Sequence, residues 1–309
     1  MIKIELNSVQ KDEINRLMKE EIKKNLFSGI HALYTYLYDN DFRKTADLIS
    51  TKEKVEHICL LENRKELKNY SLIFNKSFNE DCIGKDTNVI KKMKDEIKEK
   101  YEGLYKNFSS HVAAYKILKI MNVNVCPYCN RLYTFTVKDK TRPEFDHFFP
   151  KGKYPHLAIS IYNLIPSCGL CNKGKSEENP DDFLYPYEES FEDKGIHFVI
   201  TNTIPFLLNN NEIQIALEPI ADNANIINAY NKNFKIQDLY NQHSDYISDI
   251  FLKKNIFNED ACNSIYQSYN EIFDSPYEVK QLIFGSYEGD KLGQRPLSKL
   301  TKDILQQIK

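Results

Sequence analysis

Two Cys-x-x-Cys pairs constrain this chain more than any other feature of its sequence. Cys126 and Cys129 enclose Pro-Tyr, Cys168 and Cys171 enclose Gly-Leu, and 38 residues lie between the two pairs. A Cys-x-x-Cys turn presents two thiolates, and two such turns complete the tetrahedral ligand set of a structural zinc ion. Such an ion contributes folding free energy to a segment too short for a large core. We therefore expect one structural Zn²⁺ on all four cysteines; the alternative is a pair of thioredoxin-like redox motifs.

The other cysteines and the apolar pattern bear on the cellular compartment. Cys59, Cys82 and Cys262 lie in helix-like surroundings, where we expect them as small buried apolar residues. No stretch approaches the roughly 20 apolar residues of a membrane span. Residues 1–6 alternate apolar and polar side chains, which predicts a short strand and not a signal peptide. We expect a cytoplasmic protein that does not enter a membrane, in which thiols stay reduced.

The charge balance excludes a globally basic surface. The chain has 42 Lys and Arg against 44 Asp and Glu, so any patch for nucleic acid has to be local. Residues 126–179 are mildly basic, with eight Lys and Arg against five Asp and Glu. We expect backbone phosphate contacts from four lysines of this segment: Lys151, Lys153, Lys173 and Lys175.

Most of the chain outside this segment has helical periodicity. The clearest run is residues 88–106, with apolar side chains every three or four positions and a Lys/Glu face that is either solvated or in contact with phosphate. Ser8 is a candidate cap for the first helix. The predicted helices are residues 9–25, 30–37, 88–106, 110–121, 225–230, 242–254, 259–273, 277–284 and 296–308.

Short strands are predicted in two places. Residues 133–138 and 144–149 alternate around a turn and predict a hairpin, followed by a short helix over 156–161 and a loop over 163–166. Residues 196–201 and 212–217 predict a second pair of strands. The chain thus divides into a helical region over 1–121, a central module over 122–185 and a mainly helical region with a short hairpin over 186–309.

The central module holds residues suited to phosphodiester hydrolysis. His147, with an ordinary pKa near ~6.5, takes a proton from water at neutral pH. Asp146 points to the opposite face of an extended segment and offers oxygen to a hard cation such as Mg²⁺ or Mn²⁺. Asn172, next to Cys171, offers a second oxygen through its amide carbonyl. A divalent ion there stabilises the charge that develops on the leaving 3′-oxygen.

These residues carry a resemblance to a known family. Residues 126–176 resemble the zinc-knuckle HNH (ββα-metal) endonucleases, most closely the endonuclease VII branch. The resemblance rests on Asp146-His147 between two cysteine knuckles, on Asn163 in the middle and on Asn172 directly after the fourth cysteine. The resemblance implies a mainly α protein with a small central ββα-metal (HNH) zinc-binding module. It implies that Asn163 ties the loop to the hairpin and orients His147. The commonest HNH pattern has His at the position of Asn172. Asparagine in its place removes a nitrogen ligand, and this favours Mg²⁺ or Mn²⁺ over a catalytic zinc ion.

The overall layout also resembles that of HNH nucleases from Septu-like and retron-associated anti-phage defence systems. This second resemblance rests on the amino-acid sequence of residues 146–155. This resemblance implies a DNA-cleaving endonuclease whose helical flanks bind an ABC-type ATPase or form a homodimer. His156 is expected to pack or to contact phosphate. Two alternatives stay open at this point. One is a zinc-stabilised nucleic-acid-binding or scaffold protein with a decayed nuclease site, and the other is an RNase toxin.

Overall fold

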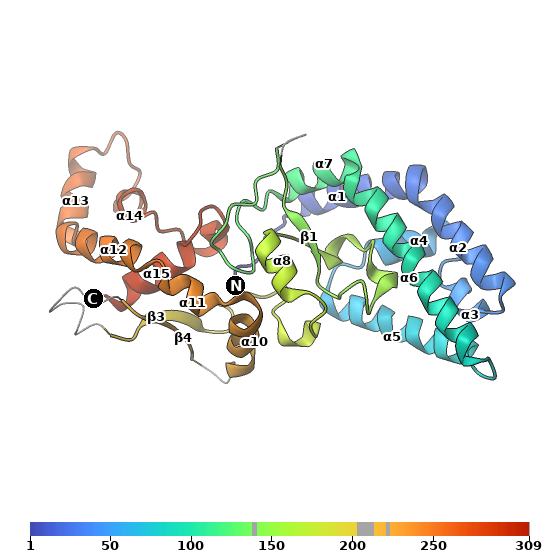
Figure 1. The fold of residues 1–309 in the computed structure, drawn as a ribbon. Helices are drawn as coiled ribbons and strands as arrows, with labels where there is room; N and C mark the ends of the chain where they lie inside the picture. Colours follow the sequence, from blue (N-terminus) through green and yellow to red (C-terminus); the bar gives the residue numbers. More distant parts are fainter. Residues whose placement is uncertain (138–140, 203–212, 221–222, 309) are drawn as a thin grey trace. The chain divides into compact units, whose positions relative to one another are not determined.

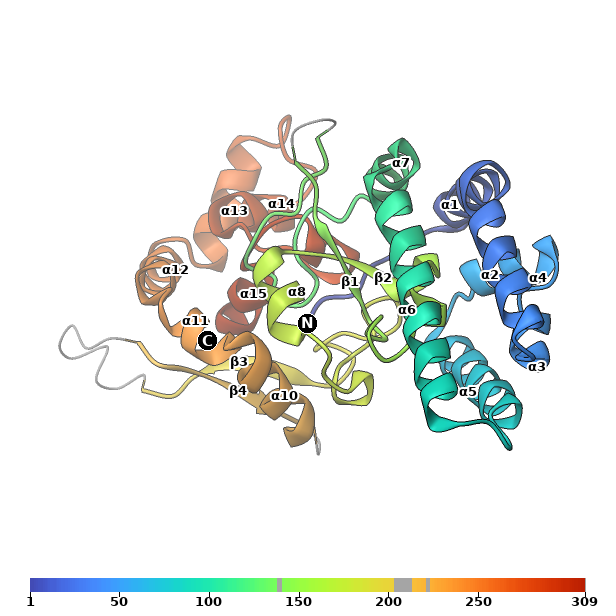
Figure 2. The same cartoon turned by 45° about the vertical axis from the view of Figure 1, so that its right-hand side comes forward.

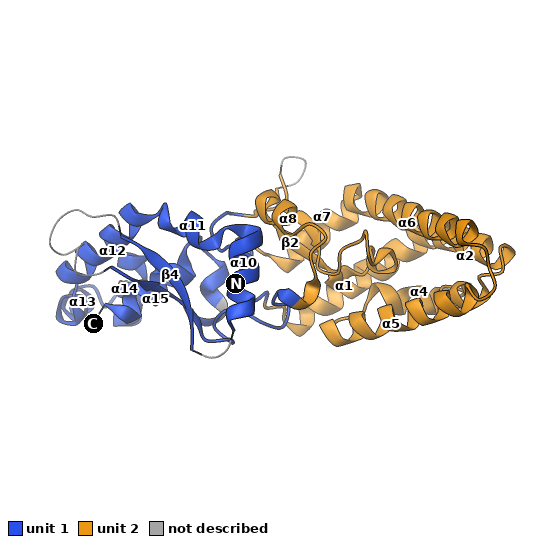
Figure 3. Ribbon diagram, turned by 60° about the horizontal axis from the view of Figure 1, so that its bottom comes forward, with its two compact units in different colours: residues 1–4, 124–133, 182–309 blue, residues 5–123, 134–181 orange. Residues whose placement is uncertain are grey.

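The structure, a computed structural model, describes residues 1–137, 141–202, 213–220 and 223–308, and it is mainly helical as the sequence predicts (Figure 1). The chain forms two compact units (Figure 3). Unit 1 comprises Met1–Ile4, Asn124–Tyr133 and Asp182–Lys309, and unit 2 comprises Glu5–Val123 and Thr134–Asp181. Most of the segment expected as a central module therefore belongs to unit 2, together with the N-terminal helices.

Helices make up most of unit 2. The longest is α6 (Thr87–Ser110), which Asp86 caps and which buries Met93, Ile97, Tyr101 and Leu104 along one side. Apolar side chains three and four positions apart share a helix face, so this face packs inward. The other N-terminal helices are α1 (Ser8–Glu21), α2 (Phe27–Asp39), α3 (Arg43–Asp47), α4 (Lys52–Cys59), α5 (Arg64–Asp81) and α7 (Val112–Met121).

The first two predicted helices run on without a break. A single π-helical turn over Ile22–Leu26 joins α1 to α2, so the expected gap before residue 30 does not exist. The cap of α1 is Asn7 and not Ser8. The Asn7 side chain accepts a hydrogen bond from the Gln10 N–H at 2.9 Å, and the Gln10 side chain accepts one from the Asn7 N–H at 3.0 Å. This reciprocal capping box satisfies two donors at the helix start.

The strand pairing in unit 2 differs from the predicted hairpin. Strand β1 (Glu144–His147) pairs antiparallel with β2 (Leu164–Ser167), and α8 (Gly169–Lys175) follows β2 and packs on β1 (Figure 2). Residues 163–166 look like a loop because Pro166 lacks an N–H group, yet each strand of a two-stranded sheet has one unpaired edge that tolerates proline. Residues 133–137 form only the isolated bridges Val125–Tyr133 and Val137–Thr141, and Lys138 lies outside the described residues.

Unit 1 combines a second two-stranded sheet with helices. Strand β3 (Ile196–Ile200) pairs antiparallel with β4 (Ile215–Pro219), and α15 (Ser298–Gln307) packs on β3. Both strands are close to their predicted positions, although Glu212 lies outside the described residues. The other α-helices among the described residues of unit 1 are α10 (Ala224–Phe234), α11 (Ile236–Asn241), α12 (Ser244–Ile256), α13 (Glu259–Ser268) and α14 (Pro276–Phe284).

The first residues of the chain do not form the predicted strand. Met1, Ile2 and Ile4 are nevertheless buried in unit 1. The Ile2 N–H donates to the Pro127 carbonyl at 2.9 Å and the Ile4 N–H donates to the Pro186 carbonyl at 2.7 Å. Among the described helices, none has the length and apolarity that crossing a membrane requires.

Candidate functional site

The four cysteines of the two knuckles come together as predicted. Their sulfur atoms all lie within 4.8 Å of one another, and all four side chains are buried. Four thiolates about 2.3 Å from a central ion suit tetrahedral zinc and leave no position open for substrate or water. This cluster therefore fits a structural zinc ion and not a catalytic one.

The backbone shapes each knuckle locally. At the first, the Asn130 N–H donates to the Cys126 carbonyl at 2.8 Å, and Asn130 adopts a left-handed φ of 49°. Asparagine tolerates this conformation better than most residues. At the second, Cys168 is the N-cap of α8, and the Asn172 N–H donates to its carbonyl at 3.0 Å. The second knuckle thus fixes where α8 begins and which residues follow it.

Strand β1 and helix α8 face each other through alternating side chains. Glu144 and Asp146 are two positions apart on β1 and so share one face. Asn172 and Lys175 are three positions apart on α8 and so share one face of that helix. The Asn172 amide donates to the Glu144 carboxylate at 2.7 Å, whereas the Lys175 ammonium contacts Asp146. Glu144 therefore belongs to the site, although no motif in the sequence pointed to it.

Asp146 forms a buried ion pair. The Lys175 nitrogen lies 3.1 Å from Oδ2 of Asp146 and donates to the His147 carbonyl at 2.8 Å. Lys175 is fully buried, and burial lowers the pKa of its ammonium while Asp146 opposes that shift. The structure thus places Lys175 in the interior and not at the surface where we expected a phosphate contact. A buried carboxylate needs a cationic or hydrogen-bonding partner, and Lys175 supplies one.

His147 is buried with a defined tautomer. Its Nε2 lies 3.0 Å from the Ala158 carbonyl. A carbonyl only accepts, so Nε2 carries the hydrogen and donates it, and Nδ1 of the neutral ring holds a lone pair. Burial lowers the pKa of His147 to about 3. The ring is therefore neutral at physiological pH, and Nδ1 has no hydrogen-bond partner among the residues that the structure describes.

Asn163 ties together the loop that follows His147. Its Oδ1 accepts from the Phe149 N–H at 2.8 Å, and its Nδ2 donates to the carbonyls of Phe149 at 3.2 Å and Leu157 at 3.0 Å. Asn163 is fully buried. Because Leu157 directly precedes Ala158, Asn163 also fixes the segment whose carbonyl anchors the His147 ring.

An aromatic side chain from α6 completes the surroundings of His147. The Tyr105 ring meets the His147 ring edge-on, with 4.4 Å between the centroids, and the Lys151 ammonium lies 5.1 Å from the centre of the Tyr105 ring. Burial raises the pKa of the Tyr105 hydroxyl. Tyr105 lies 42 positions before His147, so no local motif in the sequence pointed to it.

The lysines expected to contact phosphate have different environments. Lys173 is exposed and Lys151 is half-buried over Tyr105. Lys153 is exposed, and its ammonium donates to the Glu177 carbonyl at 2.5 Å. Together with the buried Lys175, this leaves Lys151 and Lys173 as the members of the set with no hydrogen bond within the described part of the chain.

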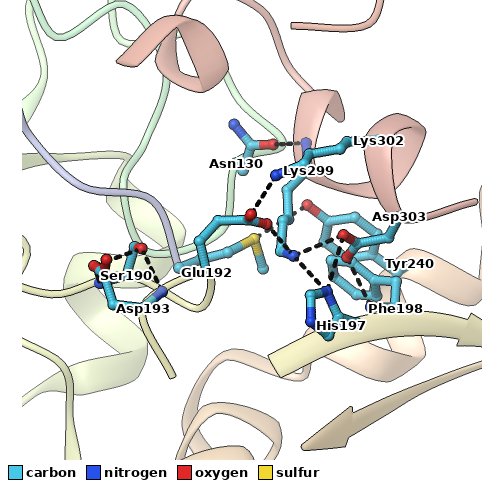
Figure 4. Close-up of polar contacts among 11 residues, drawn as sticks. Asn130, Ser190, Glu192, Asp193, His197, Phe198, Tyr240, Lys299, Lys302 and Asp303 are labelled. Atoms are coloured by element: carbon cyan, nitrogen blue, oxygen red, sulfur yellow. Dashed lines mark hydrogen bonds and ion pairs between the residues drawn. The ribbon is translucent and has the colours of Figure 1, made fainter. Parts of the chain in front are cut away.

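A second cluster of potential metal ligands lies in unit 1 and is already neutralised. Ligand atoms of Glu192, His197 and Asp303 lie within 4.8 Å of one another. Figure 4 shows the Lys299 ammonium among them, 2.7 Å from Asp303 and 3.3 Å from Nδ1 of His197, and paired with Glu192. Lys299 is fully buried, and burial raises the pKa of Asp303. Because a lysine occupies the centre, we interpret this cluster as a buried ion-pair network.

Comparison with known proteins gives one local similarity. The curated Septu protein PtuB of Bacillus thuringiensis is 34% identical over 68 residues, which cover 21% of this chain and 25% of that protein. The match thus spans about a quarter of the relative's length. No protein-family model matches the chain, and no solved structure matches it.

Proposed function

We propose that this chain is a metal-dependent endonuclease that hydrolyses DNA phosphodiester bonds with His147 as its general base. The observation that carries the proposal is the state of the His147 ring at the end of β1. Its Nε2 is fixed on the Ala158 carbonyl, which leaves the Nδ1 lone pair to accept a proton from water. The local order of β1, β2 and α8, with Asp146 before His147, supports the same reading.

Neighbouring side chains hold the His147 ring in place or supply positive charge for the substrate. Asn163 and the Ala158 carbonyl hold the ring, and Tyr105 packs against its edge. Burial keeps the ring neutral at physiological pH but, with a pKa of about 3, also makes it a weak base. The proposal therefore requires the pKa of His147 to rise when substrate binds, and an anionic phosphodiester favours the protonated ring in this way. Exposed Lys173 and half-buried Lys151 supply positive charge for the DNA backbone.

The oxygen donors near α8 fit a hard divalent cation by their chemistry. Asp146 and Asn172 would hold Mg²⁺ or Mn²⁺, which when bound neutralises charge on the leaving oxygen. Their present partners compete with this role, since Lys175 pairs with Asp146 and Glu144 accepts from Asn172. Release of the Lys175 ammonium from Asp146 is therefore part of the proposal.

The same ion pair favours a second candidate function. If Lys175 stays on Asp146, the chain is a zinc-stabilised nucleic-acid-binding or scaffold protein with a decayed nuclease site. The two functions differ in one measurable respect, because only the nuclease cuts. RNA is included as a substrate so that an RNase is recognised as such.

The test is nicking of supercoiled plasmid and of a structured RNA by the full chain, with Mg²⁺ or Mn²⁺ and with EDTA. We expect divalent-ion-dependent cleavage of DNA by the wild type and a loss of at least about 100-fold in His147→Ala, the usual scale for a general base. The matched control is His57→Ala, which changes an exposed histidine of α4. It should cut like the wild type.

Each outcome bears on a separate part of the proposal. If the wild type cuts neither substrate under any of these conditions, the nuclease proposal is wrong and the binding protein is favoured. Equal cutting by His147→Ala contradicts the assigned base but not the activity. Cleavage of RNA alone changes the substrate and retains the site.

We further propose that the protein acts in anti-phage defence. The local similarity to Septu protein PtuB supports this role. In this proposal an ABC-type ATPase or a second copy of the chain binds the helical regions and restrains cleavage until infection. Affinity purification of the chain from its native host tests the partner, and recovery of the chain alone as a monomer contradicts it.

A further inference from the structure

A pocket of about 380 Å³ in unit 2 lies beside the loop that follows His147, and no role has yet been assigned to it. Its wall combines residues of α5 and α6 with residues 152–156, and the short helix at Pro155–Leu157 packs against both long helices. The volume is within the range of small-molecule sites, which is about 300–1,000 Å³.

Aromatic rings form the apolar part of this wall. Phe74 stacks on His156 with 4.1 Å between the ring centroids and an interplanar angle of 18°. Phe78 lines the same pocket. Both rings are more than nine-tenths buried, and Phe78 also stacks on Phe42. A planar aromatic ligand therefore meets their exposed edges, and edge-to-face contact is one of the geometries that aromatic pairs favour.

His156 adds an unused polar group. The side chain is 1% exposed, and its Nε2 pairs with the Ser71 hydroxyl at 3.1 Å. Its Nδ1 is buried and has no hydrogen-bond partner among the described residues. Buried polar atoms are rarely left without a partner. Because Nδ1 is closed off from solvent in this structure, the polar edge of a ligand reaches it only when the His156 ring turns toward the pocket.

The rim of the pocket is positively charged. Lys94 and Lys98, one turn apart on α6, line it together with Lys153, against the single carboxylate of Asp95. Lys153 already donates to the Glu177 carbonyl, and the Lys94 ammonium lies 5.8 Å from the centre of the Phe78 ring. The two lysines of α6 are therefore the cations best placed for an anionic group next to the aromatic wall.

We propose that this pocket binds one nucleotide, with its base against Phe74 and Phe78 and its phosphate at Lys94 and Lys98. A planar ring with polar edges joined to an anion matches the three features of the wall: aromatic edges, an unpaired nitrogen and two cations. The nucleotide is either free or a unit of a single strand. The proposal concerns binding and does not depend on cleavage at His147.

The test is equilibrium binding to the full-length chain, measured by titration calorimetry in EDTA so that cleavage is prevented. The probes are AMP, CMP, GMP and UMP, a 12-nucleotide single strand of mixed DNA sequence, and inorganic phosphate. We expect saturable binding of a nucleotide or of the strand below about 1 mM. Lys94→Gln/Lys98→Gln should weaken binding about tenfold, and Phe74→Leu should weaken it by a similar factor.

The matched control is Lys91→Gln/Lys92→Gln, which removes the same charge from exposed positions of α6 that do not line the pocket. It should leave the dissociation constant within twofold. His147→Ala should bind like the wild type, so a failed nuclease and a failed pocket give different results. The lysine variants change only exposed side chains, which keeps the test valid if Phe74→Leu does not fold.

The outcomes separate the two sources of the ligand. Binding of free nucleotides that compete with the strand identifies a mononucleotide pocket, whereas binding of the strand alone identifies a nucleotide within a chain. Absence of saturation with every probe overturns the proposal. It is also overturned if inorganic phosphate binds as tightly as the nucleotides, or if the control variant weakens binding as much as Lys94→Gln/Lys98→Gln.

Discussion

The Lys175 ammonium lies 3.1 Å from Oδ2 of Asp146, and both side chains are buried. The same ammonium donates to the carbonyl of His147, the residue next to Asp146. One lysine of α8 therefore holds both the carboxylate and the backbone of the two residues on which the proposed chemistry depends.

Replacing Lys175 by methionine leaves the Asp146 carboxylate buried without its cation. Removal of one partner of a buried pair costs about 3–5 kcal/mol, so we expect that loss in the free energy of unfolding. Urea denaturation in EDTA measures it, and Mg²⁺ or Mn²⁺ should restore part of the loss if Asp146 binds the ion. Lys173→Met, at an exposed neighbouring position, should change stability by less than about 0.5 kcal/mol. Equal effects of the two variants contradict this prediction.

Metal analysis of the purified chain should find one tightly bound zinc ion. Cys129→Ser or Cys168→Ser should abolish it and unfold the knuckles, since structural zinc contributes directly to folding. Cys82→Ser is the control, because Cys82 is half-buried and lies outside the four-sulfur cluster. A zinc-free chain that melts at the same temperature as the purified protein would rule out the structural role.

Asn163→Ala removes three buried hydrogen bonds that hold the Phe149 and Leu157 backbone. Buried groups left unpaired cost about 1–3 kcal/mol each, and partial relaxation should limit the total to about 3–5 kcal/mol. We expect nicking to fall as well, because the Ala158 carbonyl that anchors His147 loses its support. Asn107→Ala, on the exposed face of α6, provides the comparison and should change neither quantity. Unchanged activity in a folded Asn163→Ala protein contradicts the positioning role.

Acid should destabilise the chain partly through His156. Burial lowers the pKa of His156 to about 3, against 6.5 for an ordinary histidine. The unfolded chain therefore binds a proton below pH 6.5 that the folded chain does not. This contribution to stability is complete above pH 6.5 and is lost as the pH falls toward 3, at up to about 1.4 kcal/mol per pH unit.

The measurement is the free energy of unfolding in urea, followed by circular dichroism between pH 7 and 5. His156→Asn cannot titrate in this range, so its stability should fall by about 2 kcal/mol less than that of the wild type over the lower 1.5 pH units. Other groups titrate alike in both proteins, which makes the difference specific to His156. Parallel pH profiles for the two proteins contradict the assigned burial.

Local sequence patterns predicted many of the helices and strands. The periodicity of residues 88–106 predicted the core of α6, because the apolar stripe of a helix repeats within the segment itself. The strand at residues 144–147 was anticipated, but its partner was not. The partner of a strand depends on which distant segment packs beside it, and the local sequence does not show this. Residues 164–167 also contain Pro166, a residue uncommon in strands, so the sequence predicted a loop where β2 lies.

The sequence by itself determined the chemistry that is present: four cysteines with zinc spacing, Asp146 beside His147, and asparagines at positions 163 and 172. Only the tertiary structure decided how these groups are paired. In the folded chain, Lys175 forms a buried ion pair with Asp146 and the Asn172 amide donates a hydrogen bond to Glu144. The Tyr105 ring packs edge-on against His147. Ligand types and spacings are local properties of a chain, whereas burial, ion pairing and the protonation state of a histidine depend on which distant elements pack together.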